Sequence, residues 1–307
     1  MKQPVVAVVG SLNVDLVTTT ERRPMPGETL TGRSFGTFVG GKGLNQAIAA
    51  ARLHARTSMV GRVGQDDFGQ RLLQTLQREA IDRTFVTEDA AASTGTATIV
   101  VDGSGDNSII IVPGANGRLS SADVERAAEV IRGADVLVLQ LEVPLDAVQR
   151  AAEIAHAAGV QVLLNPAPAR PLPDTLLQLV DVLAPNETET ELLTGLSVAD
   201  DESAVAAARA LLGRGVGAVV LTLGGRGSLL AKGDTIERMP GFHVQVVDTT
   251  AAGDAFCGAL AVQLAAGQAL REAVIYANAA GALATTVLGA EPAMPARAAV
   301  ERLVGQV

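Results

Sequence analysis

Two aspartates enclose a run of small residues in the last third of the chain, in the segment Asp248–Asp254 (DTTAAGD). A long apolar stretch follows, so Ala251, Ala252 and Gly253 are expected to open a helix whose first N–H groups are uncovered. Such N–H groups, together with the positive end of the helix dipole, bind anions such as phosphate. Asp254 would lie at the mouth of this helix, within reach of a hydroxyl. The pattern predicts a phosphoryl-transfer centre, and the alternative is an Asp N-cap on an ordinary buried helix.

Polar residues also follow the first predicted strand, in the segment Gly10–Asp15 (GSLNVD). Asn13 and Asp15 would lie at the carboxyl end of that strand, where open parallel sheets bind their ligands. A carboxylate accepts hydrogen bonds from two neighbouring hydroxyls, so these residues could bind a sugar. A turn stabilised by the Asn and Asp side chains is the alternative.

The glycine-rich segment Gly40–Ala47 (GGKGLNQA) is expected to bring the backbone close to a ligand at the start of a helix. Its spacing differs from the G-x-x-x-x-G-K-[ST] pattern of a P-loop, so Lys42 is not assigned the phosphate role of that motif. Lys42 could instead meet a hydroxyl or the transferred phosphate, or be a solvated lysine in a turn.

Two further segments indicate a nucleotide and its metal ion. The segment Pro185–Glu189 (PNETE) follows a buried strand and opens a helix. Asn186 and Glu189, one helical turn apart, could hold Mg²⁺ through water, whereas Glu187 is explained by the preference for acids at helix N-termini. Thr222–Gly227 (TLGGRG) ends another strand in a turn that suits nucleotide phosphates or a tight hairpin.

The composition restricts the possible partners. The chain has 307 residues, with 24 basic and 33 acidic side chains and a net charge of −9, which argues against nucleic acid and anionic membranes as partners. The single cysteine, Cys257, lies in an apolar helical stretch, excludes an internal disulfide and fits a reducing compartment. Without a signal peptide or an apolar run of membrane-spanning length, we expect a cytoplasmic protein. His54, His156 and His243 have no ligand spacing and are interpreted as structural or surface residues.

Short apolar runs alternate with helical patterns, which predicts an α/β fold of three layers, a parallel sheet flanked by helices, as a single domain over 1–307. Aromatic residues are 2% of the chain, so Ala, Val and Leu must fill the core. The predicted core strands are Val5–Gly10, Thr57–Val63, Asp135–Gln140, Val160–Leu164, Asp181–Ala184 and Ala218–Leu223. The predicted helices cover Asn45–Ala55, Phe68–Ala80, Ala122–Arg132, Pro144–Ala158, Ser203–Leu212, Asp254–Ala266 and Ala269–Val287.

Two segments, at about 13–39 and 95–112, differ from this rhythm. They alternate polar and apolar residues, and Asp102–Asn107 has the composition of a hairpin turn. We expect them to form a small sheet that acts as a lid and excludes water from the reacting phosphate. Its exposed residues Ile109, Ile110 and Ile111 would need a cover, for which a second subunit of a homodimer is the expected one.

In order and spacing, these segments resemble the ribokinase-like (phosphofructokinase-B type) carbohydrate kinase family over essentially the whole chain. Asn165–Arg170 (NPAPAR) and Gln140–Glu142 (QLE) extend the likeness. The resemblance implies that Asp254 accepts the proton of the ribose 5-hydroxyl, while the N–H groups of Ala251, Ala252 and Gly253 hold the migrating γ-phosphoryl group.

The resemblance also implies the binding residues. The sugar site would consist of Asn13, Asp15, Gly41, Lys42, Asn45, Glu142 and Asp254. The ATP site would consist of Asn186, Thr222, Gly224, Gly225, Arg226, Gly227, Gly253 and Asn278. Glu189 would order Mg²⁺ through water, and a K⁺ site would lie among Asp248, Thr250, Ala284, Val287, Gly289 and Ala293, mostly through backbone carbonyls.

The sequence departs from the family pattern at two positions. Ala293 stands where a serine is common, so K⁺ activation is less secure than phosphoryl transfer, and Asn278 stands where a histidine often lines the adenine pocket. The expected activity is ATP-dependent phosphorylation of D-ribose at its 5-hydroxyl. The alternatives are a kinase for deoxyribose, fructose or a nucleoside, and a non-catalytic sugar sensor that kept the fold. An NAD-dependent oxidoreductase is remote because the first strand lacks G-x-G-x-x-G.

Overall fold

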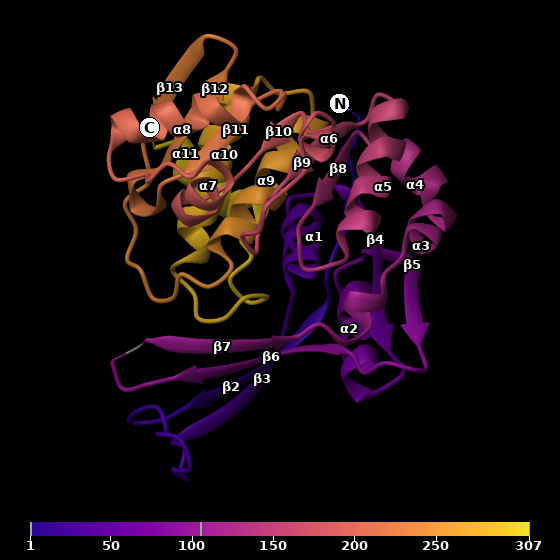
Figure 1. The fold of residues 1–307 in the computed structure, drawn as a ribbon, viewed down its shortest axis with the longest axis vertical. Coiled ribbons are helices and arrows are strands. Elements are labelled where there is room, and N and C mark those ends of the chain that lie inside the picture. Colours follow the sequence, from indigo (N-terminus) through magenta and orange to yellow (C-terminus); the bar gives the residue numbers. More distant parts are fainter. Residues whose placement is uncertain (1, 105, 307) are drawn as a thin grey trace.

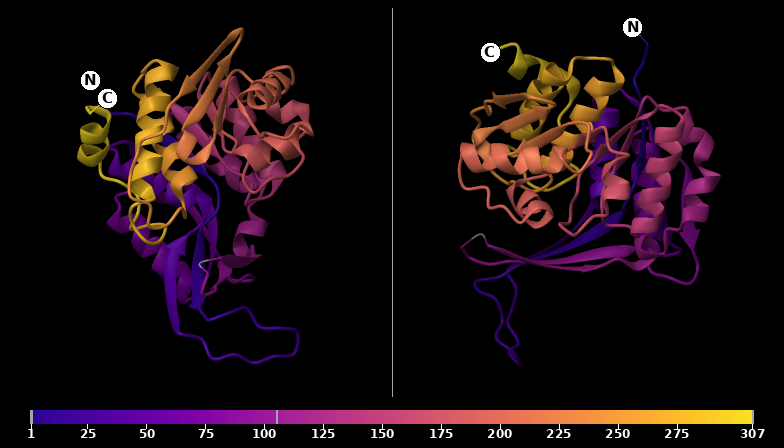
Figure 2. Two further views of the ribbon diagram at one scale, coloured as in Figure 1. Left: turned by 90° about the vertical axis from the view of Figure 1, so that its left-hand side faces the viewer. Right: turned by 45° about the horizontal axis from the view of Figure 1, so that its top comes forward.

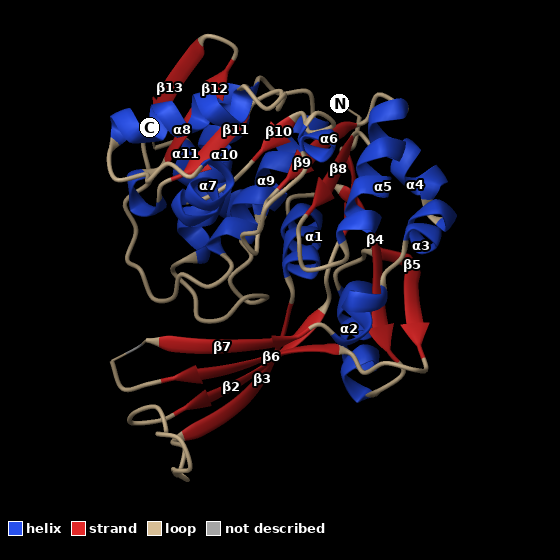
Figure 3. Cartoon of the chain, in the orientation of Figure 1, coloured by secondary structure: helices blue, strands red, loops and turns tan. Residues whose placement is uncertain are grey.

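The computed structural model describes residues 2–104 and 106–306, and its core is a nine-stranded sheet between two layers of helices (Figure 1, Figure 3). The strands lie in the order β13-β12-β11-β10-β9-β8-β1-β4-β5. Neighbours from β11 to β5 pair in parallel, whereas β12 and β13 extend the edge with antiparallel pairing. The bounds are β1 (Val5–Val9), β4 (Arg56–Gly64), β5 (Asp82–Asp89), β8 (Val136–Leu139), β9 (Gln161–Leu164), β10 (Val182–Leu183), β11 (Val219–Thr222), β12 (Ser228–Lys232) and β13 (Thr235–Met239).

Helices cover both faces of this sheet, so the predicted three-layer α/β class is confirmed. One face carries α1 (Lys42–Arg52), α2 (Asp67–Arg78), α9 (Ala252–Ala265), α10 (Leu270–Ala284) and α11 (Arg297–Val304). The opposite face carries α3 (Ser121–Arg126), α4 (Ala128–Arg132), α5 (Leu145–Ala157), α6 (Asp174–Leu177), α7 (Glu187–Thr194) and α8 (Asp201–Leu212). No helix in the described ranges is long and apolar enough to cross a membrane.

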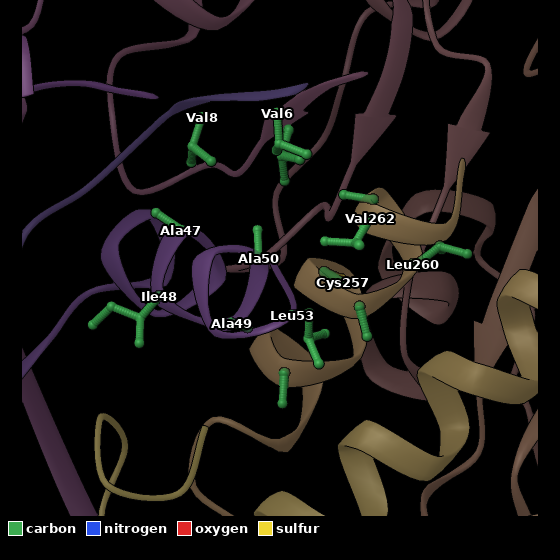
Figure 4. Close-up of a cluster of buried hydrophobic side chains, with 14 of the residues drawn as sticks. Val6, Val8, Ala47, Ile48, Ala49, Ala50, Leu53, Cys257, Leu260 and Val262 are labelled. Carbon is green, nitrogen blue, oxygen red and sulfur yellow. The ribbon is translucent and has the colours of Figure 1, made fainter. Parts of the chain in front are cut away.

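Alternate side chains of the central strands enter the two helical layers. In β1, Val6 and Val8 pack in the layer of α1 and α9, whereas Ala7 and Val9 pack in the layer of α5. Figure 4 shows Val6 and Val8 facing small residues of α1, with Cys257 on the neighbouring turn of α9. Both faces of the sheet are therefore buried under helices, which explains why each central strand is apolar along its whole length.

The two segments expected to form a small sheet do so. Strands β2 (Asn13–Thr19), β3 (Ser34–Gly40), β6 (Gly95–Val101) and β7 (Asn107–Val112) form a separate sheet in the order β3-β2-β6-β7. This sheet projects from one end of the core, and a long loop between β2 and β3 extends beyond it (Figure 2). Val101 lies opposite Asn107 in the β6–β7 pair, and the hairpin expected between them includes residue 105, which lies outside the described residues. The role of the small sheet as a lid stays a prediction.

Several boundaries differ from the sequence prediction. The expected helix over Ala122–Arg132 is divided at Ala127, whose backbone (φ −92°, ψ 4°) leaves the helical region, and the last long helix ends at Ala284 rather than Val287. Strands β5, β12 and β13 were not anticipated. Strands β5 and β13 lie at the two edges of the sheet, where polar residues are tolerated and the apolar signal is weak. Strand β12 lies between β11 and β13 and is buried from Ser228 to Ala231, and its apolar run is short.

Candidate active site

The N-terminus of α9 has the open form that phosphate binding requires. Its N-cap is Ala251, a non-glycine residue in the left-handed region (φ 58°), and no side chain in the described part of the chain caps the helix. Within residues 2–104 and 106–306, the N–H groups of Ala251 and Gly253 have no acceptor, while that of Ala252 donates to Thr249 O at 3.3 Å. Because Asp254 lies in the first turn and not at the N-cap, the alternative of an ordinary capped helix is wrong.

The carboxylate of Asp254 is buried, with 5% exposure, and both of its oxygens accept hydrogen bonds from α1. Asn45 Nδ2 donates to Oδ2 at 2.9 Å, and Gln46 Nε2 donates to Oδ1 at 2.9 Å. The two helices pack closely because a side chain at Gly258 would collide with Gln46 O and Ala49 Cβ. Gln46 was missed by the sequence analysis, although it directly follows Asn45.

Residues of the predicted sugar site gather around Glu142. Its Oε2 accepts hydrogen bonds from Ser11 Oγ at 2.5 Å, from the N–H of Lys42 at 3.2 Å and from Asn13 Nδ2 at 3.4 Å. Gly41 makes this approach possible, since its φ of 92° suits glycine and a side chain there would meet the backbone of residues 11–13. Asn13 and Lys42 therefore lie together, as the resemblance implied, and Lys42 begins α1 rather than a solvated turn.

Asp15 lies on β2 close to the same acids. Burial raises its pKa to about 6, and the charges of Glu142 and Asp254 add to the effect. Gly40 on the neighbouring strand leaves room for this carboxylate, since a side chain there would collide with it. A carboxylate held so unfavourably is satisfied best when a ligand supplies hydroxyl donors.

A cavity of about 230 Å³ lies between Asp254 and α7, and Lys42, Asn186 and Glu189 contribute to its wall. Asn186 and Glu189 form a capping box, in which Asn186 N and Nδ2 donate to Glu189 at 2.9 and 3.0 Å. Burial raises the pKa of Glu189, although the bond from Asn186 and the charge of Lys42 oppose it. For Lys42 burial alone would lower the pKa, but Asp254, Glu142 and Glu189 together raise it. The lysine is thus a cation inside an acidic cavity, suited to a phosphate.

A second cavity of about 340 Å³ continues on the other side of the α9 N-terminus and shares Thr222, Thr249, Ala252 and Gly253 with the first. Its wall includes the following residues expected at the ATP site: Thr222, Gly224, Gly225, Gly227, Gly253 and Asn278. Asn278 Nδ2 donates to Ser228 Oγ at 3.1 Å. The two cavities therefore adjoin at the N-terminus of α9, one reaching the glycine-rich turn and the other reaching Asp254.

One residue expected at the ATP site lies outside the walls of both cavities. The side chain of Arg226 pairs with Glu187 of α7 at 2.5 Å, because the short turn Gly224–Arg226 directs it toward that helix. His243 is exposed, which agrees with its interpretation as a structural or surface residue, and it also belongs to the wall of the larger cavity. No spacing signal marked its place there, since its neighbours in the cavity come from distant segments.

Asp248 connects the two segments expected to hold K⁺, one around Thr250 and the other around Gly289. Its Oδ1 accepts from Thr250 N at 2.9 Å and from Thr250 Oγ1 at 2.7 Å, and its Oδ2 accepts from Gly289 N at 2.9 Å. Burial alone would raise the pKa of Asp248, but these hydrogen bonds lower it. Ala284 ends α10 just before this loop, and Val287 and Ala293 belong to the same segment. Ala293 contributes no side-chain oxygen to this loop.

Comparison with known proteins agrees with this arrangement. Residues 3–297 match the pfkB family carbohydrate kinase model. The chain belongs to the pfkB family of carbohydrate kinases. Among proteins similar to this kinase, a ribokinase of Haemophilus influenzae is 42% identical over 290 residues, which cover 94% of this chain and 95% of that protein. A deoxyribokinase of Salmonella typhi is 43% identical over 257 residues, 83% of this chain and 84% of its own length.

The structure of Arabidopsis thaliana ribokinase complexed with ribose and ATP resembles this kinase with a TM-score of 0.91, at 36% identity and with 99% of each chain covered. The family and fold predicted from the sequence are thereby confirmed.

Proposed function

We propose that this kinase transfers the γ-phosphoryl group of ATP to the 5-hydroxyl of D-ribose. The observation that carries the proposal is the place of Asp254, whose carboxylate is held by two amides beside an uncapped helix end that borders both cavities. The similar proteins named ribokinase support ribose as the acceptor.

In the proposed reaction, Asp254 accepts the proton of the 5-hydroxyl as that oxygen attacks the γ-phosphorus. The N–H groups at Ala251 and Gly253 face the charge that develops on the phosphoryl oxygens, and Lys42 adds a positive charge from the cavity wall. Phosphoryl transfer of this kind depends on positioning and on electrostatic stabilisation, with little covalent work by the protein.

The sugar would be held between α1 and β2 in this proposal. Asn45 Oδ1 is buried and has no partner among the described residues, so it is available to a hydroxyl. Asn13 and Asp15 approach from β2 of the small sheet. Glu142 accepts hydrogen bonds from both Asn13 Nδ2 and the N–H of Lys42, and so holds these two segments together. These acceptors outnumber the donors, which suits a ligand rich in hydroxyl groups.

Two cations belong to the proposal. Glu189 would hold Mg²⁺ through water, and the ion would neutralise charge on the nucleotide phosphates. The loop of Asp248, Thr250 and Gly289 would hold K⁺, with backbone carbonyls near Ala284, Val287 and Ala293 completing the shell. The fit of both sites rests on oxygen donors that line or adjoin the cavities.

The small sheet is proposed to close over the sugar as a lid and to join two subunits. Its support is the apolar surface of β7, where Ile109 and Ile111 on one side of the strand are 52% and 43% exposed and Ile110 on the other side is 67% exposed. Such a surface is costly to leave in water and is normally covered. A cytoplasmic location belongs to the same proposal, because its donor would be ATP.

The deciding experiment measures ADP release from MgATP with ribose, 2-deoxyribose, fructose and adenosine, with and without K⁺. We expect the highest kcat/KM with ribose. A higher kcat/KM with 2-deoxyribose would reassign the substrate. This sugar is included because the chain is 43% identical to a deoxyribokinase. Tight ribose binding without ADP release would indicate a sensor and reject the kinase assignment.

A further inference from the structure

A buried chain of side-chain amides connects Asp254 to the backbone of the main sheet. Gln46, Gln140 and Asn165 are 0%, 0% and 7% exposed, and come from α1 and from the carboxyl ends of β8 and β9. Asn165 Nδ2 donates to Ala184 O at 3.0 Å, and Gln46 Nε2 donates to Asn165 Oδ1 at 3.2 Å. Gln140 Nε2 donates to Gln46 Oε1 at 2.7 Å. The second hydrogen of Gln46 Nε2 reaches Asp254 Oδ1 at 2.9 Å.

These contacts determine which end of each amide faces its neighbour. Ala184 O can only accept, so Asn165 must present its NH₂ group to it and its oxygen to Gln46. Gln46 must then present its NH₂ group to Asn165 and Asp254, while its oxygen accepts from Gln140. An inverted Gln46 would place its oxygen against two other oxygens and its NH₂ group against that of Gln140. The carbonyl of Ala184 thus determines the orientation of the Asn165 amide, which determines that of Gln46, which donates to the Asp254 carboxylate.

The network is more polar than packing alone would require. Gln140 Oε1 is buried without a hydrogen-bond partner among the described residues, and any side chain at Gly10 would collide with it. An unpaired buried oxygen lowers stability, and an apolar side chain of similar size at 140 would avoid this loss. Gln140 contributes one bond here, the donor to Gln46, so the arrangement serves the orientation of Gln46.

We propose that Gln46 is a positioning residue for the reaction, which holds the Asp254 carboxylate so that a free lone pair faces the sugar hydroxyl, and that Gln140 and Asn165 fix Gln46 for this task. The inference rests on the proposed function of Asp254 as the base. Among the described residues, the side chain of Gln46 hydrogen-bonds to Asp254 and to two buried amides, so its effect should be on the chemical step and not on sugar affinity.

The test compares Gln46→Met and Gln140→Met with the unaltered enzyme in steady-state kinetics with MgATP and ribose. Gln46→Met keeps the length of the side chain and removes its amide, so kcat should fall roughly 30- to 100-fold with the KM for ribose within about threefold. Gln140→Met leaves Gln46 in place without its anchor, and kcat should fall about 5- to 10-fold. In the double variant the second substitution should add nothing, because both act through one bond.

The division of the effect between kcat and KM separates this role from a purely structural one, because loss of the Gln46 donor should lower kcat while the KM for ribose stays unchanged. The control is Thr75→Val, which removes a buried hydroxyl whose hydrogen bond among the described residues goes to Arg71 O within α2, and which should leave both kcat and KM unchanged.

The outcomes are distinguishable. If the unaltered protein phosphorylates no sugar, the proposed function fails and this inference falls with it. If the unaltered protein is active and Gln46→Met has the same kcat, or alters KM alone, the positioning role is rejected while the kinase assignment stands. If Gln46→Met does not fold, Gln140→Met decides: a lower kcat at unchanged KM supports the role, and an unchanged kcat overturns it.

Discussion

Asn45 Nδ2 and Asp254 Oδ2 lie 2.9 Å apart, although 209 positions separate the two residues in the sequence. The bond joins the first turn of α1 to the first turn of α9, so the sugar side and the phosphate side of the site share one hydrogen bond. It also explains how the carboxylate can be buried and still be ready for a substrate, because each oxygen keeps a lone pair beyond its single amide donor.

Replacement of the proposed base should abolish turnover. Asp254→Asn keeps the shape and removes the proton acceptor, so kcat should fall by about 10³-fold or more, while the Kd for ribose changes less than about fivefold. Calorimetry measures the Kd and ADP release measures kcat. Asp146→Asn, an exposed aspartate in the first turn of α5, is the matched control and should behave as the unaltered enzyme. Substantial activity in Asp254→Asn would reject the assigned base.

Sugar binding should weaken in mild acid because of Asp15. Its pKa of about 6 in the folded protein means that the carboxylate gains a proton as the pH falls through 6 and loses acceptor capacity for hydroxyls. The Kd for ribose should therefore rise between pH 7 and pH 5, as measured by calorimetry. Asp15→Asn should bind ribose more weakly and without this pH dependence; an unchanged profile would contradict the role.

The Asp15 carboxylate should also lower the free energy of unfolding at neutral pH, whereas a carboxylate in an ion pair would raise it. Because the folded pKa lies above the unfolded value of 3.8, the charged form is disfavoured in the folded state. This destabilisation is absent below pH 3.8, grows as the pH rises to 6 and is complete above it, up to about 3 kcal/mol. Thermal melts without ligand should show that Asp15→Asn raises Tm more at pH 8 than at pH 5. An equal effect at both values would indicate that Asp15 is not held in this way.

Activation by K⁺ should strengthen when the missing hydroxyl is restored. Ala293 is buried in the segment that Gly289 ties to Asp248, so a serine there adds an oxygen ligand near the proposed ion. Ala293→Ser should lower the K⁺ concentration for half-maximal activity by a few-fold, measured at constant ionic strength with Na⁺ as the balancing ion. Equal curves for both enzymes would place the ion elsewhere.

Subunit association should depend on the exposed side of β7 that carries Ile110. Ile110 is 67% exposed on that strand, and a charge there would be buried without a partner in a dimer that covers it. Ile110→Asp should shift the protein from dimer to monomer in sedimentation equilibrium. Met25→Asp, equally exposed at 67% but in the loop between β2 and β3, should leave the mass unchanged. A monomeric unaltered protein would contradict the proposed interface.

The segments of the site could be predicted from the sequence because they follow strands of one parallel sheet. Asn13 comes after β1 and Asn186 after β10, and the carboxyl ends of such strands meet at one edge. The N-terminus of α9 was predictable for a similar reason, since small residues before an apolar helix leave its N–H groups open.

The contacts within the site could not be predicted in this way. Gln46 bonds to Asp254 across 208 positions and to Gln140 across 94, and no spacing rule connects residues so far apart. The direction of the Arg226 side chain depends on a three-residue turn and on Glu187, which a local pattern does not show. Propensity and periodicity describe single elements, whereas these features arise where elements meet.

Gly258 lets the backbones of α1 and α9 approach each other directly, so the contact between these two backbones determines the distance from the amide donors to Asp254. A side chain there would meet Gln46 O, so α1 and α9 touch without an intervening layer of side chains that heat could loosen. The geometry around Asp254 should therefore persist as long as these helices stay in contact, and on warming the enzyme should lose its activity and its tertiary structure within the same narrow range of temperature.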